Sequence, residues 1–155
     1  MWTLIREDER AAFARWDTLL VAVLRAPLDA LFFDGLDDVL RDMAQSGEGT
    51  VSVLLVRAGA SPGKMSGEAR ERAKDLLGHV DRLRALTYVN AGSGLKAKLL
   101  RGAMNAALTR ASFPAKVFTD VEGALGWLSG LPGQDAAVRD GGDELRRTVN
   151  EFLAR

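Results

Sequence analysis

The chain has 155 residues and a mass of 16.7 kDa, a size typical of one compact domain. Its 21 basic side chains balance its 21 acidic ones, which disfavours strong attraction to nucleic acid or to a membrane surface. The absence of cysteine excludes disulfides, thiolate nucleophiles and zinc-thiolate or iron–sulfur sites, and a single histidine excludes a histidine-rich metal site. We therefore expect a protein without a metal or another cofactor.

The N-terminal residues 1–8 lack the basic start and the apolar core of a signal peptide. No apolar run reaches the length of about 18 residues that a membrane span requires. We expect a cytoplasmic protein.

The first 26 residues fit two structures. Apolar residues between Ala12 and Leu24 fit a helix that begins at Asp8, but residues 19–24 form an unbroken apolar run with β-branched members, which is typical of a buried strand. The intervening Trp-Asp-Thr is a plausible turn. We favour two strands, at residues 11–16 and 19–25.

Alternating helices and strands follow. Apolar residues at helical spacing predict a helix over residues 28–43, between Pro27 and Gly47. The same kinds of pattern predict, in chain order, a buried strand at 50–56, a helix over 68–86, a strand at 86–89, a helix over 95–108, a strand at 115–118 and a helix over 121–128. This alternation indicates the α/β class, with a mixed sheet of four or five strands and packed helices.

The C-terminal part has a different composition. Residues 131–142 are rich in glycine, as linkers are, and Asp143 is placed to cap a helix over 144–154. One face of this helix carries the apolar residues Leu145, Val149, Phe152 and Leu153. A helix of about three turns is marginal alone, so we expect it to dock on its own sheet or on a second copy. Of these two we favour the second copy, and hence a homodimer.

Two segments resemble STAS domains, the fold of anti-sigma-factor antagonists of the SpoIIAA type. LRAPLDA at residues 24–30 resembles the Gly-x-Leu-Asp-Ala junction that closes a strand and opens a helix. KVFTDVEGALGWL at residues 116–128 resembles the closing strand and the F-D-x-x-E-A-L-x-W-L helix of the SpoIIAA-like branch. The resemblance implies a SpoIIAA-like domain over residues 1–130. The composition of the rest of the chain predicts that a linker over 131–142 and a C-terminal amphipathic helix over 143–155 follow it.

The resemblance also implies a candidate phosphorylation site. In the signalling members, a partner kinase phosphorylates a serine or threonine at the start of the helix after the central strand. The equivalent loop here, residues 57–67, lacks the family's Asp-Ser pair. Ser66 is the best positional candidate because it immediately precedes the helix, and Ser61 is the second. We favour a plain helix-capping role for Ser66, because serine commonly caps helices.

A glycine-containing loop offers a candidate ligand site between the strand at 86–89 and the helix over 95–108. Its candidate ligand-binding residues are Asn90, Gly92, Ser93, Gly94 and Lys96. Glycines let a backbone approach a ligand, and a helix N-terminus favours an anion. The third glycine of a dinucleotide fingerprint is absent, and we favour a structural turn.

The zero net charge hides a division along the chain. Residues 28–46 contain five aspartates and one arginine, whereas residues 90–115 contain two lysines and two arginines and no acid. Such polarity would steer a charged protein partner or a head-to-tail contact with another copy. Ordinary solvated helix faces are an equally good explanation.

The resemblance implies a non-enzymatic protein-interaction module in bacterial signalling or regulation. Its partner would be a protein, such as a kinase or a regulatory protein, and neither nucleic acid nor a membrane. The sequence displays no catalytic set. The alternative is a protein that binds a small anionic ligand, such as a nucleotide or a phosphorylated metabolite, or a transferase, which would use the loop at residues 90–96.

Overall fold

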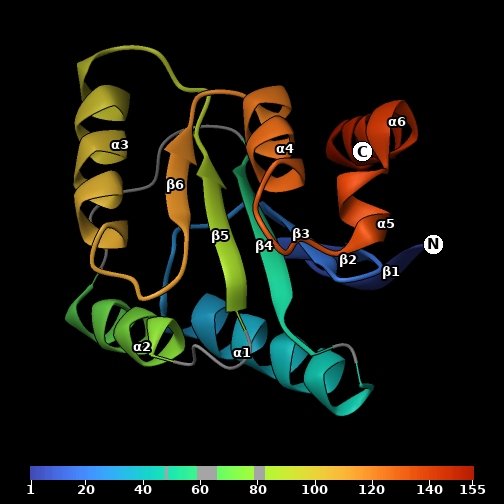
Figure 1. Cartoon of the computed structure of the whole chain (residues 1–155). Helices are drawn as coiled ribbons and strands as arrows, with labels where there is room; N and C mark the ends of the chain where they lie inside the picture. Colours follow the sequence, from blue (N-terminus) through green and yellow to red (C-terminus); the bar gives the residue numbers. More distant parts are fainter. Residues whose placement is uncertain (48, 59–65, 79–82) are drawn as a thin grey trace.

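The computed structural model describes residues 1–47, 49–58, 66–78 and 83–155. Within them, one sheet contains the strands β1 (Trp2–Glu7), β2 (Ala11–Trp16), β3 (Leu19–Leu24), β4 (Val51–Arg57), β5 (Leu83–Val89) and β6 (Ala115–Phe118). The strands lie in the sheet in chain order (Figure 1). β1, β2 and β3 pair antiparallel, and β3, β4, β5 and β6 pair parallel.

Helices cover both faces of this sheet. They are α1 (Ala30–Gln45), α2 (Gly67–Leu77), α3 (Leu95–Leu108), α4 (Val121–Ser129), α5 (Ala136–Arg139) and α6 (Gly142–Leu153). The apolar residues of α1 and α2 join one core, and those of α4, α5 and α6 join the core on the opposite face. α3 stands beside β6 at the end of the sheet, and its last turns contribute the buried Leu108 and the partly buried Met104 to the α1 and α2 core (Figure 1).

The central strand β3 shows why the sequence carries an unbroken apolar run. Leu20, Ala22 and Leu24 face the core under α1 and α2, and the alternate residues face the core under α4 to α6. A strand buried on both faces has no polar side, so its sequence does not alternate between apolar and polar residues. The two strands predicted at residues 11–16 and 19–25 are confirmed, as β2 and β3.

The junction after β3 begins α1. Asp29 is the N-cap of this helix, and its carboxylate accepts the backbone N–H of Phe32 at 3.0 Å. The same carboxylate pairs with Arg10, which precedes β2. The Leu-Asp-Ala motif therefore caps the helix and ties its start to the neighbouring strand.

Some predicted elements differ from the structure. The sheet has six strands and not four or five: the edge strand β1 was missed, because its exposed residues lack the apolar pattern of a buried strand. Its register with β2 is broken by an irregularity between Leu4 and Arg6. The helix predicted over 68–86 is also too long, because α2 ends at Leu77, with Gly78 as its C-cap, and β5 begins at Leu83.

The predicted linker contains structure of its own. Residues 131–142 include the short helix α5, and they bury Gln134 and Val138. α6 begins two residues earlier than its predicted start, with Gly141 at the N-cap position where we expected Asp143.

The tail helix α6 docks on its own sheet. Its buried residues Leu145, Val149 and Phe152 join the core that covers β2 and β3. Trp16 reinforces this docking, because its Nε1 donates a hydrogen bond to the carbonyl of Ala137 at 3.0 Å. In this structure the chain covers the apolar face itself, and the homodimer remains a prediction.

Candidate functional site

Two parallel strands bring polar side chains together at their carboxyl ends. Leu55 of β4 lies beside Tyr88 of β5 in the sheet, and both side chains belong to the core under α1 and α2. Arg57 follows Leu55 by two residues, and Asn90 follows Tyr88 by two. Because side chains of a strand alternate between faces, Arg57, Tyr88 and Asn90 share the face that α1 and α2 cover.

The side chain of Arg57 is buried without a charge partner. The residue is 7% exposed, and its Nη1 donates a hydrogen bond to the carbonyl of Ala26 at 2.5 Å. Its Nε and Nη2 are buried and bond to no described residue. No carboxylate of the described residues forms an ion pair with it. A buried cation in this state is unfavourable unless a charge and hydrogen-bond acceptors reach it.

Asn90 is held in place from several sides. It is 2% exposed, and its Oδ1 accepts the backbone N–H of Gly92 at 3.0 Å. Its own backbone N–H donates to the carbonyl of Phe118 at 3.1 Å. Arg101 of α3 donates from Nη1 to the carbonyls of Asn90, at 3.0 Å, and of Gly92, at 2.6 Å. The Nδ2 of Asn90 is buried and bonds to no described residue.

Tyr88 adds a third unpaired donor to this end of the sheet. The residue is 1% exposed, and its hydroxyl is buried with no hydrogen-bond partner among the described residues. The sequence pattern singles out Asn90 but not Tyr88 or Arg57. A lone tyrosine in an apolar strand and an arginine at a strand end give no signal of a site, because both are ordinary there.

The rest of the predicted ligand loop lies outside this cluster. Gly92, Ser93, Gly94 and Lys96 are exposed. Gly94 has a φ of +94°, which favours glycine, and a Cβ on Gly92 would stand 3.1 Å from the Cβ of Ala97. These features explain the two glycines as the requirements of a tight turn into α3.

The predicted phosphorylation site forms a helix cap. Ser66 is exposed and is the N-cap of α2, and its Oγ accepts the backbone N–H of Ala69 at 3.1 Å. This is the geometry of the capping role that we favoured. Ser61 lies outside the described residues.

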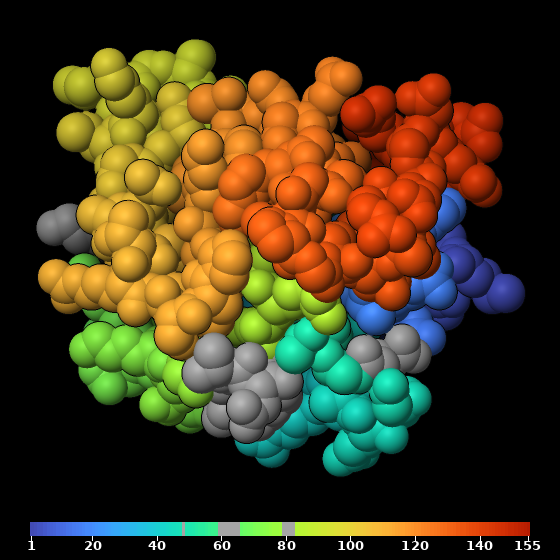
Figure 2. All heavy atoms as spheres, in the orientation of Figure 1, coloured from blue at the N-terminus to red at the C-terminus, as the bar shows by residue number. Residues whose placement is uncertain are grey.

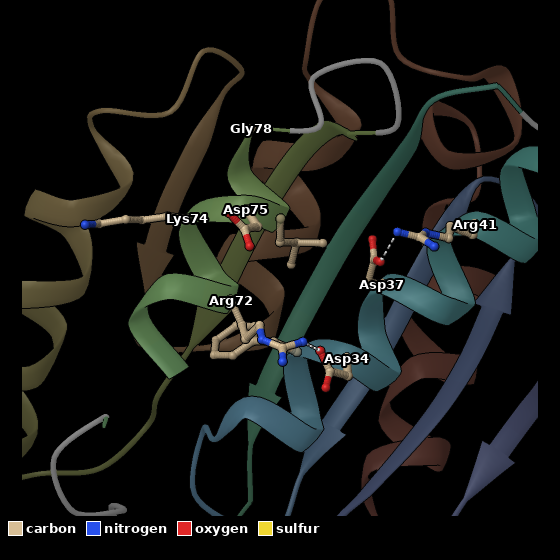
Figure 3. A pocket seen from close by; sticks show the side chains of 9 residues that line it. Asp34, Asp37, Arg41, Arg72, Lys74, Asp75 and Gly78 are labelled. Carbon is tan, nitrogen blue, oxygen red and sulfur yellow. Dashed lines mark hydrogen bonds and ion pairs between the residues drawn. The ribbon is translucent and has the colours of Figure 1, made fainter. Parts of the chain in front are cut away.

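A groove of about 510 Å³ separates α1 from α2. Figure 3 shows Asp34 of α1 facing Arg72 of α2, and the two form an ion pair across the groove. Asp37 pairs with Arg41 within α1 at 3.0 Å. The ion pair between Asp34 and Arg72 ties the two helices together, and the pairing of these four side chains leaves little of their charge for a ligand.

The outer side of α3 is apolar and uncovered. We define the α3 face as Leu95, Leu99, Gly102, Ala103 and Ala106, which share one side of the helix by their spacing. Leu95 is 71% exposed and Leu99 is 63% exposed, and the three small residues are exposed as well. α3 forms a border of the molecule in the space-filling view, where it is coloured yellow (Figure 2).

Comparison with known proteins bears on the fold. No model of a known protein family matches the chain, and no curated protein matches its sequence. Among solved structures, the chain is similar to an uncharacterized protein of the DUF3478 family from Shewanella loihica PV-4, which has a SpoIIAA-like fold. The two share 20% sequence identity with a TM-score of 0.51, over 83% of this chain and 92% of that chain. The SpoIIAA-like fold that the sequence motifs implied is thus confirmed.

The described residues contain no helix that is both long enough and apolar enough to cross a membrane. They also contain no group of three or more histidine, aspartate or glutamate side chains placed to hold a metal ion.

Proposed function

We propose that the protein is a non-enzymatic, STAS-like interaction module of bacterial signalling or regulation, and that the α3 face is its docking surface. The partner is a protein that presents an apolar segment flanked by acidic side chains. The observation that carries the proposal is the pair of exposed leucines, Leu95 and Leu99, on a helix whose charged residues are all basic.

The exposed leucines favour association. Burying a leucine side chain contributes roughly 1.5–3 kcal/mol, and Leu95 and Leu99 lie one helical turn apart, where a single partner reaches both. An amphipathic helix laid against an apolar surface is a common form of peptide recognition. The small residues of the α3 face give such a helix a close approach.

The basic residues of α3 select an acidic partner. Lys96 and Lys98 are exposed, and neither forms an ion pair with another described residue. Arg110, just after the helix, is also exposed and also forms no ion pair with another described residue. Complementary charges would raise the rate of encounter with an acidic surface and disfavour a basic one.

A different protein fits this surface better than a second copy does. The acidic residues of α1 are the natural counterpart within the chain, but Asp34 and Asp37 already pair with Arg72 and Arg41, which leaves the exposed Asp38 and Asp42. Two copies joined through α3 itself would bring Lys96 and Lys98 toward like charges. The unpaired basic residues therefore point outward, to acids of another chain.

A photo-crosslinking residue at position 99 tests the proposal in cells, with position 31 as the matched control. Leu31 of α1 is 68% exposed, close to the exposure of Leu99, and lies outside α3. We expect one protein to be crosslinked from position 99 and not from position 31. With the purified complex, Leu99→Glu should weaken binding by at least about tenfold, and Leu31→Glu should not. Equal binding by the two variants would overturn the proposal.

A further inference from the structure

We propose that Arg57, Tyr88 and Asn90 form an internal binding site for an oxyanion, the phosphate or carboxylate group of a small metabolite. The site lies at the carboxyl ends of β4 and β5, on the face that α1 and α2 cover. It is separate from the α3 face and does not depend on the interaction that we propose there.

The guanidinium of Arg57 presents the edge that binds oxyanions. Nη1 is engaged by the carbonyl of Ala26 at 2.5 Å, which fixes the orientation of the planar group. The two atoms left without a partner, Nε and Nη2, form one side of the fork and donate two parallel hydrogen bonds. Bidentate pairing of this kind is how arginine recognises carboxylate and phosphate groups.

The other unpaired atoms have the same hydrogen-bonding character. Nδ2 of Asn90 is a donor only, and the hydroxyl of Tyr88 can donate. The acceptor of the Asn90 amide, Oδ1, is already used by the N–H of Gly92, so the amide orientation leaves the donor free. Three side chains on one face of neighbouring strands thus offer unpaired hydrogen-bond donors. The ligand that fits them is a group that only accepts hydrogen bonds.

The charge of the cluster also selects an anion. Arg57 carries one positive charge, and no aspartate or glutamate of the described residues pairs with it. A water molecule would supply an acceptor but no countercharge, whereas an oxyanion supplies both. The carboxyl ends of parallel strands are also where α/β proteins commonly hold ligands.

The full-length protein titrated with sodium phosphate, sodium acetate and sodium chloride at matched ionic strength provides the first test. We expect phosphate or acetate to raise the melting temperature with saturation, and chloride to have no such effect. The arginine Nε–H signal that disappears in Arg57→Lys should shift in the NMR spectrum of the wild type as the oxyanion is added. Comparison of the phosphate and acetate arms identifies the preferred oxyanion.

Two variants test the residues. Arg57→Lys keeps the charge but loses the fork, and should weaken oxyanion binding by at least about tenfold. Asn90→Asp keeps the acceptor for Gly92, loses the free donor and places a carboxylate near Arg57. It should therefore abolish oxyanion binding and leave the melting temperature without oxyanion unchanged or higher.

Lys96→Ala serves as the matched control, because it removes an exposed cation from the start of α3 without touching the cluster. Binding should survive in this variant. Loss of binding in Lys96→Ala with retention in Arg57→Lys and Asn90→Asp would move the site to the exposed loop and overturn the proposal. Absence of any saturable response to phosphate and acetate in the wild type would overturn it as well.

Discussion

Gln134 and Ser52 are 82 positions apart in the chain and hydrogen bond to each other inside the core, with Nε2 of Gln134 3.0 Å from Oγ of Ser52. The same Nε2 lies 3.0 Å from the carbonyl of Leu128, and Oε1 accepts the backbone N–H of Asp135 at 2.8 Å. One amide thus joins the middle of the sheet to the end of α4 and to the start of α5.

Replacement of Gln134 should loosen this connection. Gln134→Ala leaves the hydroxyl of Ser52 and the carbonyl of Leu128 buried without their partner, so we expect the free energy of unfolding to fall by about 1–3 kcal/mol. Gln45→Ala, at an exposed position, is the control and should have little effect. Urea unfolding of the three proteins measures the difference. Ser52→Ala should then cost less in the Gln134→Ala background than in the wild type, and equal costs would contradict the role given to the pair.

The aromatic contact between Trp2 and Phe152 should carry much of the docking of α6. The two ring centroids are 5.2 Å apart in an edge-on arrangement, and Phe152 is buried. Phe152→Ala should lower the free energy of unfolding by about 3–5 kcal/mol, whereas Glu151→Ala, on the exposed side of the helix, should not. Amide hydrogen exchange should accelerate in β1 of the Phe152 variant. Unchanged exchange there would show that β1 does not depend on the tail.

The carboxylate of Asp8 should make stability depend on pH in acid. Its Oδ1 accepts the backbone N–H of Arg10 at 2.7 Å and of Ala11 at 3.0 Å. The bond from Ala11, followed by that from Arg10, holds the pKa of Asp8 below its ordinary value of 3.8. Because the pKa is lower in the folded state, the stabilisation is complete above 3.8 and is lost as the pH falls through the folded pKa.

NMR titration of the Asp8 carboxyl group measures this effect directly. We expect a midpoint below 3.8 in the folded protein. The stability advantage of the wild type over Asp8→Asn should be greatest at neutral pH and should shrink as Asp8 becomes protonated. A midpoint at or above the ordinary value would remove the basis for this pH dependence.

The capping and the phosphorylation of Ser66 can be separated by substitution. Ser66→Ala removes the acceptor of the Ala69 N–H and should destabilise the protein by about 1 kcal/mol, whereas Ser66→Asp keeps an acceptor at the helix start. Thermal unfolding of both variants, with Ser93→Ala as an exposed control, measures the cap. Mass spectrometry of protein isolated from bacterial cells tests the phosphate. If phosphate is consistently absent from Ser66, capping of α2 is the role of this residue.

The sequence predicted the strands best where the sheet is buried on both faces. β3 and β4 carry apolar residues on both faces, and the run from Leu19 to Leu24 could be assigned as a strand for that reason. β1 could not be assigned in this way, because an edge strand pairs with one neighbour only, and all of its residues except Trp2 are exposed. The folded segment around Gln134 was missed for a related reason: its partner Ser52 is distant in sequence, and local composition favours a linker.

The candidate site was only partly visible in the sequence. Asn90 was selected because it opens a glycine-containing loop, and that loop explains the turn but not the cluster. The side chains of Arg57 and Asn90 come to one face because β4 and β5 are parallel neighbours in a fixed register. Register between strands that are more than 30 residues apart depends on the whole sheet, so the grouping of Arg57, Tyr88 and Asn90 emerges only from the structure.

The order of the sheet has a consequence for the protein during its synthesis. From β2 onward, each strand pairs with the strand made just before it, so the sheet can grow as the chain leaves the ribosome. The apolar residues Ala14, Leu19 and Val21 nevertheless face the side that α6 covers, and α6 is made after all six strands. A ribosome that pauses before α6 would hold a chain with a nearly finished sheet and an uncovered apolar surface, which is a state that chaperones bind and that aggregates readily.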